Sequence, residues 1–277
     1  MMKQRKRPFR PSLVFIHAFL MLSSLLCLFP FYWMVVGATS SSKEITKGVL
    51  WFGQEFINNI QAMMSSGGNY WRAFLNSVII TGIQVPLALL ICSMAGYGFE
   101  KFQNKIRNKL FNAFLLTMMI PFVAIMIPLF NMMFDIGLID TKLSVITASL
   151  ANTFLIFFFR QSFKAFPTEI IEAARIDGCG EFYIFFRIVC PPMRTTFAAA
   201  MIYAFMKEWN NYLWPLLTLQ STDSRTLTLY ISNLSSAYYV DYGQIMVAVV
   251  LSTLPTILLF SLLQKQFVAG ILGSVKG

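Results

Sequence analysis

Polar and aromatic residues interrupt an apolar stretch in the last third of the chain. The segment Lys207-Glu208-Trp209-Asn210-Asn211-Tyr212 contains a cation, a carboxylate, two amides and two aromatic rings. These groups can hold a polar ligand by hydrogen bonds and ring contacts, and polar residues within an apolar span are candidates for function. The same side chains can instead join neighbouring helices to one another. Both interpretations are open for Trp209, Asn210, Asn211 and Tyr212.

The rest of the sequence offers no set of residues suited to catalysis. The single histidine, His17, has no partner for a metal site, and the four cysteines form no CxxC pair. Gly48 and Gly53 have the glycine spacing of a nucleotide-binding loop, but Gln54 and Glu55 follow where Lys and Ser or Thr are required. Because Ser/His/Asp sets and paired carboxylates are also missing, we expect neither catalysis nor ATP hydrolysis by this chain.

A charged loop at about 164–194 contains two short helical patterns separated by glycines. Pro167 and Glu169 suit the start of the first helix, and Gly178 lets the chain turn after it. The second pattern covers Glu181 to Val189 and ends before two prolines. Such a knob is too polar for lipid and too apolar for water, which is typical of a surface that contacts a protein partner.

Long apolar segments must position both groups of residues. Of the 277 residues, 57% are hydrophobic and 12% are charged, whereas soluble domains carry about 25% charged residues. Segments long enough to cross a hydrocarbon layer of about 30 Å run over 12–36, 73–98, 110–134, 143–163, 195–219 and 243–267. They do not alternate as barrel strands would. We therefore predict an all-α, polytopic membrane protein with six transmembrane helices, forming a single domain over 1–277.

The basic residues orient these helices. They gather at the N-terminus (Lys3, Arg5, Lys6, Arg7, Arg10) and in the loops that share its side, such as Lys101 to Lys109 and the 164–194 loop. The positive-inside rule then places both termini in the cytoplasm. A net charge of +10 would also suit nucleic acid, but binders cluster their cations on one folded face, so we expect no nucleic acid partner. The first apolar segment is longer than the 7–15 residues of a signal core and is expected to be retained.

The charged loop resembles a known motif. Glu172, Ala173, Ala174, Gly178, Ile188 and Pro191 have the types and spacing of the EAA loop of type I ABC importer permeases. A leucine is usual in that family where Cys190 stands here. The resemblance implies that these six residues form the coupling loop, which docks on the ATP-hydrolysing subunit.

Other segments extend the resemblance over nearly the whole chain. Asn76-Ser77, Ala95-Gly96-Tyr97, Glu208 to Leu213 and Gly273 to Gly277 are similar to carbohydrate-importer permeases, above all to the maltose-permease G type. This implies a multi-pass protein of the bacterial cytoplasmic membrane with the type I ABC importer permease fold. The implied partners are a homologous permease in a heterodimer, two ATP-binding subunits and an extracytoplasmic sugar-binding protein. The chain itself needs no cofactor, since its partners bind ATP, and Trp209 to Tyr212 are candidates for lining the translocation path.

Two other classes of membrane protein fit the sequence less well. An ion-driven secondary transporter needs buried acidic ion sites, but Glu208 alone lies clearly within a span, and the charged loop would have no role. A membrane-embedded enzyme lacks its catalytic residues. Within the importer class, an amino acid or phosphate importer is the alternative to a sugar importer.

Overall fold

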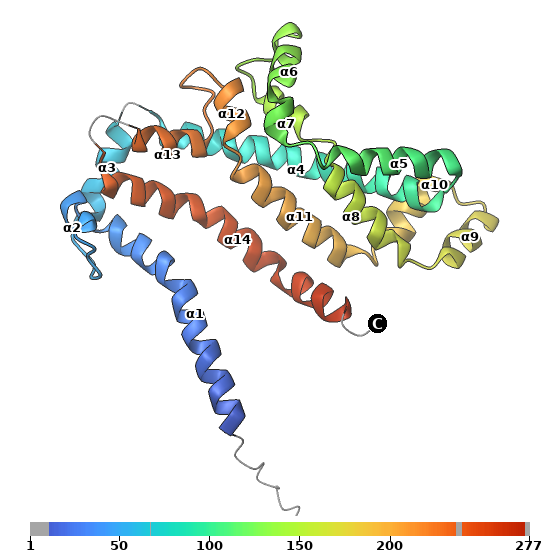
Figure 1. Cartoon of the computed structure of the whole chain (residues 1–277), viewed down its shortest axis with the longest axis horizontal. Helices are drawn as coiled ribbons and strands as arrows, with labels where there is room; N and C mark the ends of the chain where they lie inside the picture. The colour runs from blue at the N-terminus through green and yellow to red at the C-terminus, as the bar shows by residue number, and fades with distance from the viewer. Residues whose placement is uncertain (1–10, 67, 237–239, 275–277) are drawn as a thin grey trace, which may run out of the picture. The chain divides into compact units, whose positions relative to one another are not determined.

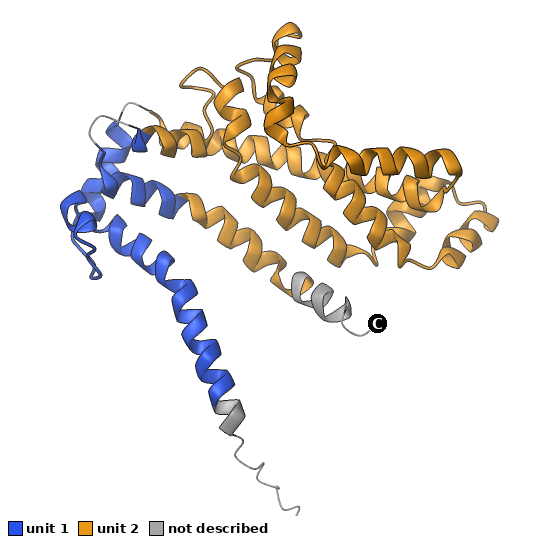
Figure 2. Cartoon of the chain, in the orientation of Figure 1, with its two compact units in different colours: residues 1–66, 234–251 blue, residues 67–233, 252–277 orange. Residues whose placement is uncertain are grey.

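The computed structural model describes residues 11–66, 68–236 and 240–274. Within these ranges every regular element is a helix, which confirms the prediction of an all-α chain. The basic N-terminal residues and the last three residues of the Gly273–Gly277 segment lie outside the described residues. The chain divides into two compact units, 1–66 with 234–251 and 67–233 with 252–277 (Figure 2). A single transmembrane domain over 1–277 stays a prediction.

Unit 1 contains α1 (Pro11–Ala38), α2 (Ser42–Thr46), α3 (Phe56–Ser65) and the beginning of α14 (Tyr242–Ser274). Large apolar side chains cover α1 from Phe15 to Phe31 and are mostly exposed, as suits a helix surrounded by lipid. A capping box starts α2, in which the Ser41 N–H donates to the Glu44 carboxylate at 2.8 Å and the Ser41 hydroxyl accepts from the Glu44 N–H.

Unit 2 is built around α4 (Tyr70–Lys101), which packs along α8 (Thr153–Lys164) and α11 (Arg194–Trp209) (Figure 1). Its core contains fully buried aromatic and aliphatic side chains, among them Phe159, Phe163 and Ala88. The remaining helices are α5 (Lys105–Thr117), α6 (Phe122–Asp135), α7 (Lys142–Ala148), α9 (Thr168–Ile176), α10 (Glu181–Tyr183), α12 (Leu213–Thr218) and α13 (Leu227–Ser235), with a π-helix at Ile184–Val189 after α10.

Gly96 makes the close packing of α4 on α8 possible. A Cβ atom at this position would lie 2.8 Å from the Phe159 Cβ and 2.9 Å from the Arg160 backbone nitrogen. Arg160 reaches across the same contact, with its Nε 3.3 Å from the Glu100 Oε2 and its guanidinium 3.9 Å from the centre of the Phe111 ring. Both members of this ion pair are largely buried, which fixes α4, α5 and α8 to one another.

Three described helices, α1, α4 and α14, are long and apolar enough to cross a membrane. Three bent pairs raise the number to six if each pair is one span. The bend is 101° between α5 and α6, 43° between α7 and α8, and 91° between the α10–π-helix segment and α11.

The fifth predicted span, 195–219, does not form one helix. It consists of α11, which ends at Trp209, and the short α12. The Asn210 amide donates to the Met206 carbonyl at 2.8 Å, so a side chain takes up an end carbonyl of the helix. Pro121 likewise separates α5 from α6, because proline has no N–H to donate to the preceding turn.

Candidate functional site

The 164–194 loop folds into the knob that the sequence predicts. The knob, as we use the term, comprises α9, α10 and the π-helix 184–189. Ile171 is fully buried and Ala174 nearly so, and together they pack α9 against the core of unit 2. Glu172 and Ala173 lie on the opposite, exposed face. That face also carries the exposed apolar side chains of Ile170 and Ile176, so an apolar strip with a carboxylate beside it is open to a partner.

An ion pair holds the two helical pieces of the knob together. The Arg175 Nε lies 2.6 Å from the Glu181 Oε1, and the Tyr97 hydroxyl of α4 donates to the other Glu181 oxygen at 3.4 Å. The hydrogen bond to Glu181 raises the pKa of the Arg175 guanidinium, against the opposing effect of burial. Lys101 adds a hydrogen bond from its Nζ to the Phe166 carbonyl at 2.8 Å. The knob is therefore attached to the end of α4.

Gly178 forms the turn between α9 and α10. Its φ is +82°, a left-handed conformation that glycine reaches without a Cβ clash. The Gly178 N–H donates to the Arg175 carbonyl at 3.0 Å and thereby closes the end of α9. Ile188 is half-buried against the core, and Pro191 follows the π-helix at the surface.

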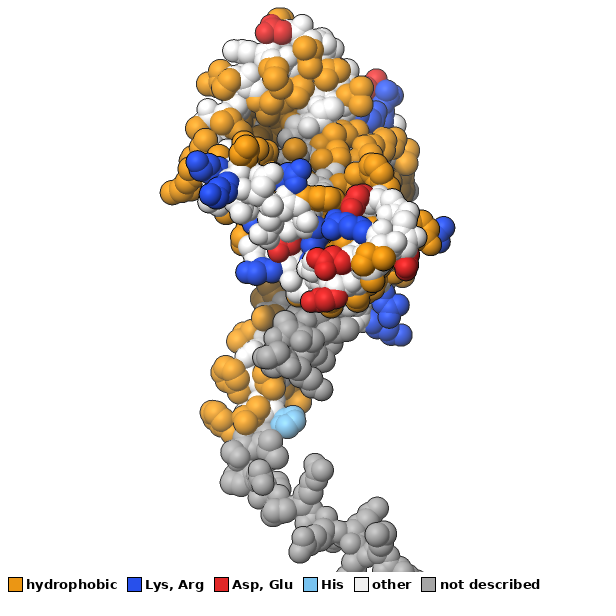
Figure 3. Space-filling model, turned by 90° about the vertical axis from the view of Figure 1, so that its right-hand side faces the viewer, with side chains coloured by type: hydrophobic (Ala, Val, Ile, Leu, Met, Phe, Trp, Pro, Cys, Tyr) orange, Lys and Arg blue, Asp and Glu red, His pale blue; other side chains and the backbone are white. Residues whose placement is uncertain are grey.

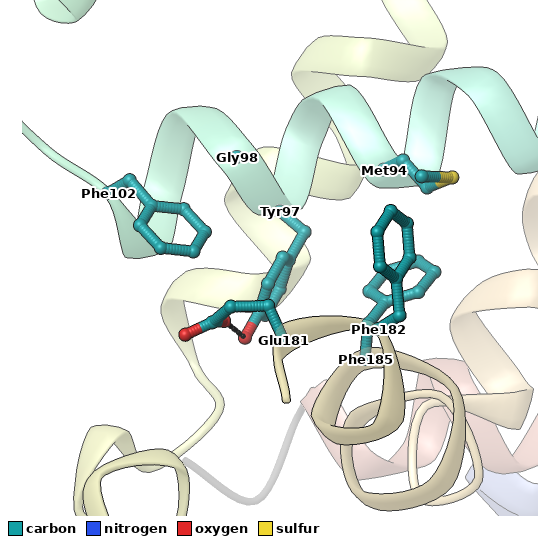
Figure 4. Close-up of a pocket in the computed structure, with 7 residues that line it drawn as sticks. All are labelled: Met94, Tyr97, Gly98, Phe102, Glu181, Phe182 and Phe185. Atoms are coloured by element: carbon teal, nitrogen blue, oxygen red, sulfur yellow. Dashed lines mark hydrogen bonds between the residues drawn. The ribbon is translucent and has the colours of Figure 1, made fainter. Parts of the chain in front are cut away.

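A small apolar pocket of about 180 Å³ lies between α4 and the knob (Figure 4). Its walls are Met94, Tyr97, Gly98 and Phe102 from α4 and its end, and Glu181, Phe182 and Phe185 from the knob. Charged side chains of both signs gather beside apolar ones over this end of unit 2 (Figure 3). The pocket offers carbon surface almost without polar groups, so it suits packing rather than the binding of a polar solute.

A larger cavity of about 580 Å³ lies where three pairs of helices break, between α5 and α6, α7 and α8, and α11 and α12. This volume is in the range of pockets that take small-molecule ligands, about 300–1,000 Å³. Polar side chains in the wall are Thr117, Ser149, Asn152, Thr153, Lys207 and Asn211, and the aromatic ones are Phe122, Phe154, Tyr203 and Trp214. We call it the break cavity.

The break cavity brings together only part of the predicted pathway cluster. Asn211 lines it, and its amide donates to Glu208 at 3.3 Å. Trp209 is buried instead, where its indole N–H donates to the Ser252 carbonyl at 3.0 Å. Asn210 is exposed and bonded to its own helix, and the Tyr212 hydroxyl accepts from Ser232 at 3.1 Å. The role of all four in a pathway stays a prediction, and the geometry favours Asn211.

Several residues of the cavity wall were not singled out from the sequence. Thr117 and Phe122 flank Pro121, while Ser149 and Asn152 mark a polar interruption between α7 and α8. Both signals are visible in the sequence as a proline and a polar cluster inside apolar segments. Which of them meet at one cavity depends on the packing of α4, α8 and α11, which the sequence does not reveal.

The long apolar helices are typical of a multi-pass helical membrane protein. Residues 88–273 match the family model described as "Binding-protein-dependent transport system inner membrane component". This chain belongs to that family. Membership agrees with the recognised resemblance to importer permeases and favours that interpretation over an ion-driven secondary transporter.

Curated relatives match the chain almost from end to end. The lactose transport system permease protein LacG of Rhizobium radiobacter is 47% identical over 260 residues, covering 94% of this chain and 95% of that protein. The arabinooligosaccharides transport system permease protein AraQ of Bacillus subtilis is 36% identical over 264 residues, covering 94% of each. The sn-glycerol-3-phosphate transport system permease protein UgpE of Yersinia pestis is 29% identical over 272 residues, covering 95% of this chain and 97% of that protein.

A solved structure has the same fold. It is described as a bacterial ABC transporter involved in the import of the acidic polysaccharide alginate, and its matching chain superposes with a TM-score of 0.82 at 22% sequence identity. The match covers 95% of this chain and 100% of that one. The predicted importer permease fold is thereby confirmed, while the number of six spans and the orientation of the termini stay predictions.

Proposed function

We propose that this chain is the membrane-spanning permease subunit of a binding-protein-dependent ABC importer for a sugar or oligosaccharide. It is a non-catalytic translocation subunit without a cofactor of its own, and ATP is bound and hydrolysed by partner subunits. It pairs with a homologous permease and receives its substrate from an extracytoplasmic binding protein. Six helical spans place both termini and the knob in the cytoplasm.

The observation that carries this proposal is the break cavity, which lies in a chain that is 47% identical to a lactose transport permease. Helices broken at the depth of the membrane are tolerated where they line a cavity, because the freed backbone groups then find partners there. At the start of α8 one freed group is met by a side chain, since Asn152 accepts from the Leu155 N–H at 3.1 Å. The Trp214 indole N–H joins α12 to α7 by donating to the Ser144 carbonyl at 2.9 Å. Aromatic rings and amides in the same wall suit the faces and hydroxyls of a sugar.

The exposed face of α9 supports the coupling role. Glu172, Ala173 and Gly178 are exposed, whereas Ala174 and Ile188 pack the knob against the core of unit 2. Movement of a docked ATPase would be transmitted through α9 and the Arg175–Glu181 pair to Tyr97 of α4. Since α4 also packs on α8 and α11, the same helix connects the knob to two elements of the cavity wall.

Reconstitution tests this proposal. The tagged chain is expressed with its genomic neighbours, purified in mild detergent and placed in liposomes with the sugar-binding protein. We expect co-purification of a homologous permease and an ATPase, and uptake of a labelled sugar that requires ATP inside the liposomes. Uptake by this chain alone, driven by a proton or sodium gradient, would refute the proposal.

A further inference from the structure

We infer that the break cavity contains a subsite for the anionic group of an acidic saccharide, with the Lys207 ammonium as its cation. This inference rests on the proposed function, because it names the substrate class of the same cavity. The anionic group is a carboxylate or a phosphate ester, and the sugar ring occupies the aromatic part of the wall.

Lys207 is the single charged residue among those that line the break cavity in the described part of the chain. Its ammonium makes no hydrogen bond and no ion pair within 4.0 Å to any described residue. A charge at membrane depth is costly unless it faces water or meets an opposite charge, and such residues commonly mark substrate pathways. Lys207 thus presents a positive charge, without an ion-pair partner within 4.0 Å in the described part of the chain, to the space that a substrate would occupy.

The neighbouring acid, Glu208, attracts the Lys207 ammonium but forms no ion pair with it within 4.0 Å. Glu208 is buried, is not part of the cavity wall, and accepts a hydrogen bond from the Asn211 amide at 3.3 Å. Consecutive helical residues also point in different directions. The Glu208 carboxylate therefore accepts from Asn211 behind the cavity wall, while the Lys207 side chain is part of that wall.

The rest of the wall explains why the ligand is a saccharide rather than a simple anion. The rings of Phe154 and Tyr203 are in contact, with centroids 4.5 Å apart, and form an aromatic surface beside Lys207. Asn211 and Asn152 add amides that can bond to hydroxyls. A small inorganic anion would leave most of a 580 Å³ cavity unfilled.

Direct binding to the assembled transporter, without the binding protein, tests the inference. Two matched pairs of probes are used. Cellobiose and cellobiouronic acid test for a carboxylate, and trehalose and trehalose 6-phosphate test for a phosphate ester. We expect at least one anionic probe to bind more tightly than its neutral counterpart. Lys207→Met should lower the affinity for that probe by about tenfold or more, because hydrogen bonds to charged groups are stronger than those between neutral groups. Lys207→Arg should restore most of the affinity.

Lys105→Met is the matched control, because Lys105 is exposed at the opposite end of α5 and lies outside the cavity wall. Added salt should weaken the binding of the anionic probes but not that of the neutral probes, because salt screens the interaction between charges. Failure of every anionic probe to bind, or equal binding to wild type and Lys207→Met, would overturn the inference. So would loss of permease assembly in Lys207→Met, which would mean that Lys207 pairs with the other permease. In each case ATP-driven uptake of a neutral sugar would leave the proposed function intact.

Discussion

Asn210 and Asn211 are adjacent and of one type, but their surroundings differ. Asn210 lies at the surface and donates to the Met206 carbonyl, while Asn211 lines the break cavity and bonds to Glu208. The difference arises because α11 ends at Trp209, so each residue after it takes a new direction. Function at this position therefore depends on where the helix ends.

Asn211→Ala should lower sugar uptake, and Asn210→Ala should not. The first change removes an amide from the cavity wall and one partner of Glu208, while the second removes a bond to the protein's own helix end. Loss of one hydrogen bond, about 0.5–1.5 kcal/mol, predicts a decrease of roughly two- to tenfold in kcat/KM. Uptake kinetics in liposomes measure it. Equal behaviour of the two variants would place Asn211 outside the path.

Gly178→Asp and Glu172→Lys should impair coupling without preventing insertion. A Cβ at Gly178 meets no atom within 4 Å, so the cost is the left-handed backbone, about 1–2 kcal/mol. Both variants change the charge of the face that we expect to meet the ATPase. Sugar-stimulated ATP hydrolysis and uptake, normalised to inserted protein, should both fall by more than about tenfold, because breaking a buried charged contact costs several kcal/mol.

Gly180→Asp is the control for this prediction. Gly180 has φ −72° and ψ 154° and precedes α10, where aspartate is a favoured N-cap residue. The same charge is therefore added two residues away on an unstrained backbone. If Gly178→Asp and Glu172→Lys retain full stimulation and transport, the knob is not the coupling element.

At this scale the sequence was most informative about the knob. Proline, glycine and the short apolar pattern predict two helices and a turn, and the structure has them at 168–176 and 181–189, with a positive φ at Gly178. These are local signals. The pathway cluster depends instead on contacts between segments far apart in the chain, such as Trp209 with Ser252, and these carry no local signature.

At the scale of elements, the breaks are the features that the sequence described least well. It predicted 110–134 and 195–219 as continuous spans, whereas the structure has α5 and α6 at 101° and separates α11 from α12. A proline inside a membrane helix is compatible with a mild kink or with a complete break. Pro86 and Pro255 lie inside the unbroken α4 and α14, so the residue type alone does not decide.

Gly96→Ala should destabilise the packing of α4 on α8, and Gly98→Ala should not. The methyl group at Gly96 would overlap the Phe159 Cβ and the Arg160 backbone, and overpacking of this kind costs about 1–3 kcal/mol. The methyl group at Gly98 meets no atom within 4 Å, and alanine favours the helix. The Tm of the detergent-purified protein measures both. A Tm for Gly96→Ala equal to that of Gly98→Ala would mean that the two helices do not touch here.

For the whole molecule, the central question is which end of unit 2 faces the cytoplasm. The end of α4, the first turns of α5 and the knob carry basic residues near one another along the chain or in space, namely Lys101, Lys105, Arg107, Lys109 and Arg175. Basic residues beside membrane spans are retained on the cytoplasmic side. An ATPase hydrolysing cellular ATP must also meet the knob on that side. The basic residues and the proposed coupling role thus predict the same orientation.

Cysteine labelling tests this orientation. In a variant without the native cysteines, single replacements Lys47→Cys and Thr222→Cys are made at exposed positions in the connections after α2 and after α12. Lys105→Cys and Asp177→Cys are placed at the start of α5 and the end of α9. With six spans, an impermeant maleimide should label the first pair in right-side-out vesicles and the second pair only after the membrane is opened. Labelling of Asp177→Cys in sealed vesicles would place the knob outside, where no ATP is available, and the coupling role would have to be abandoned.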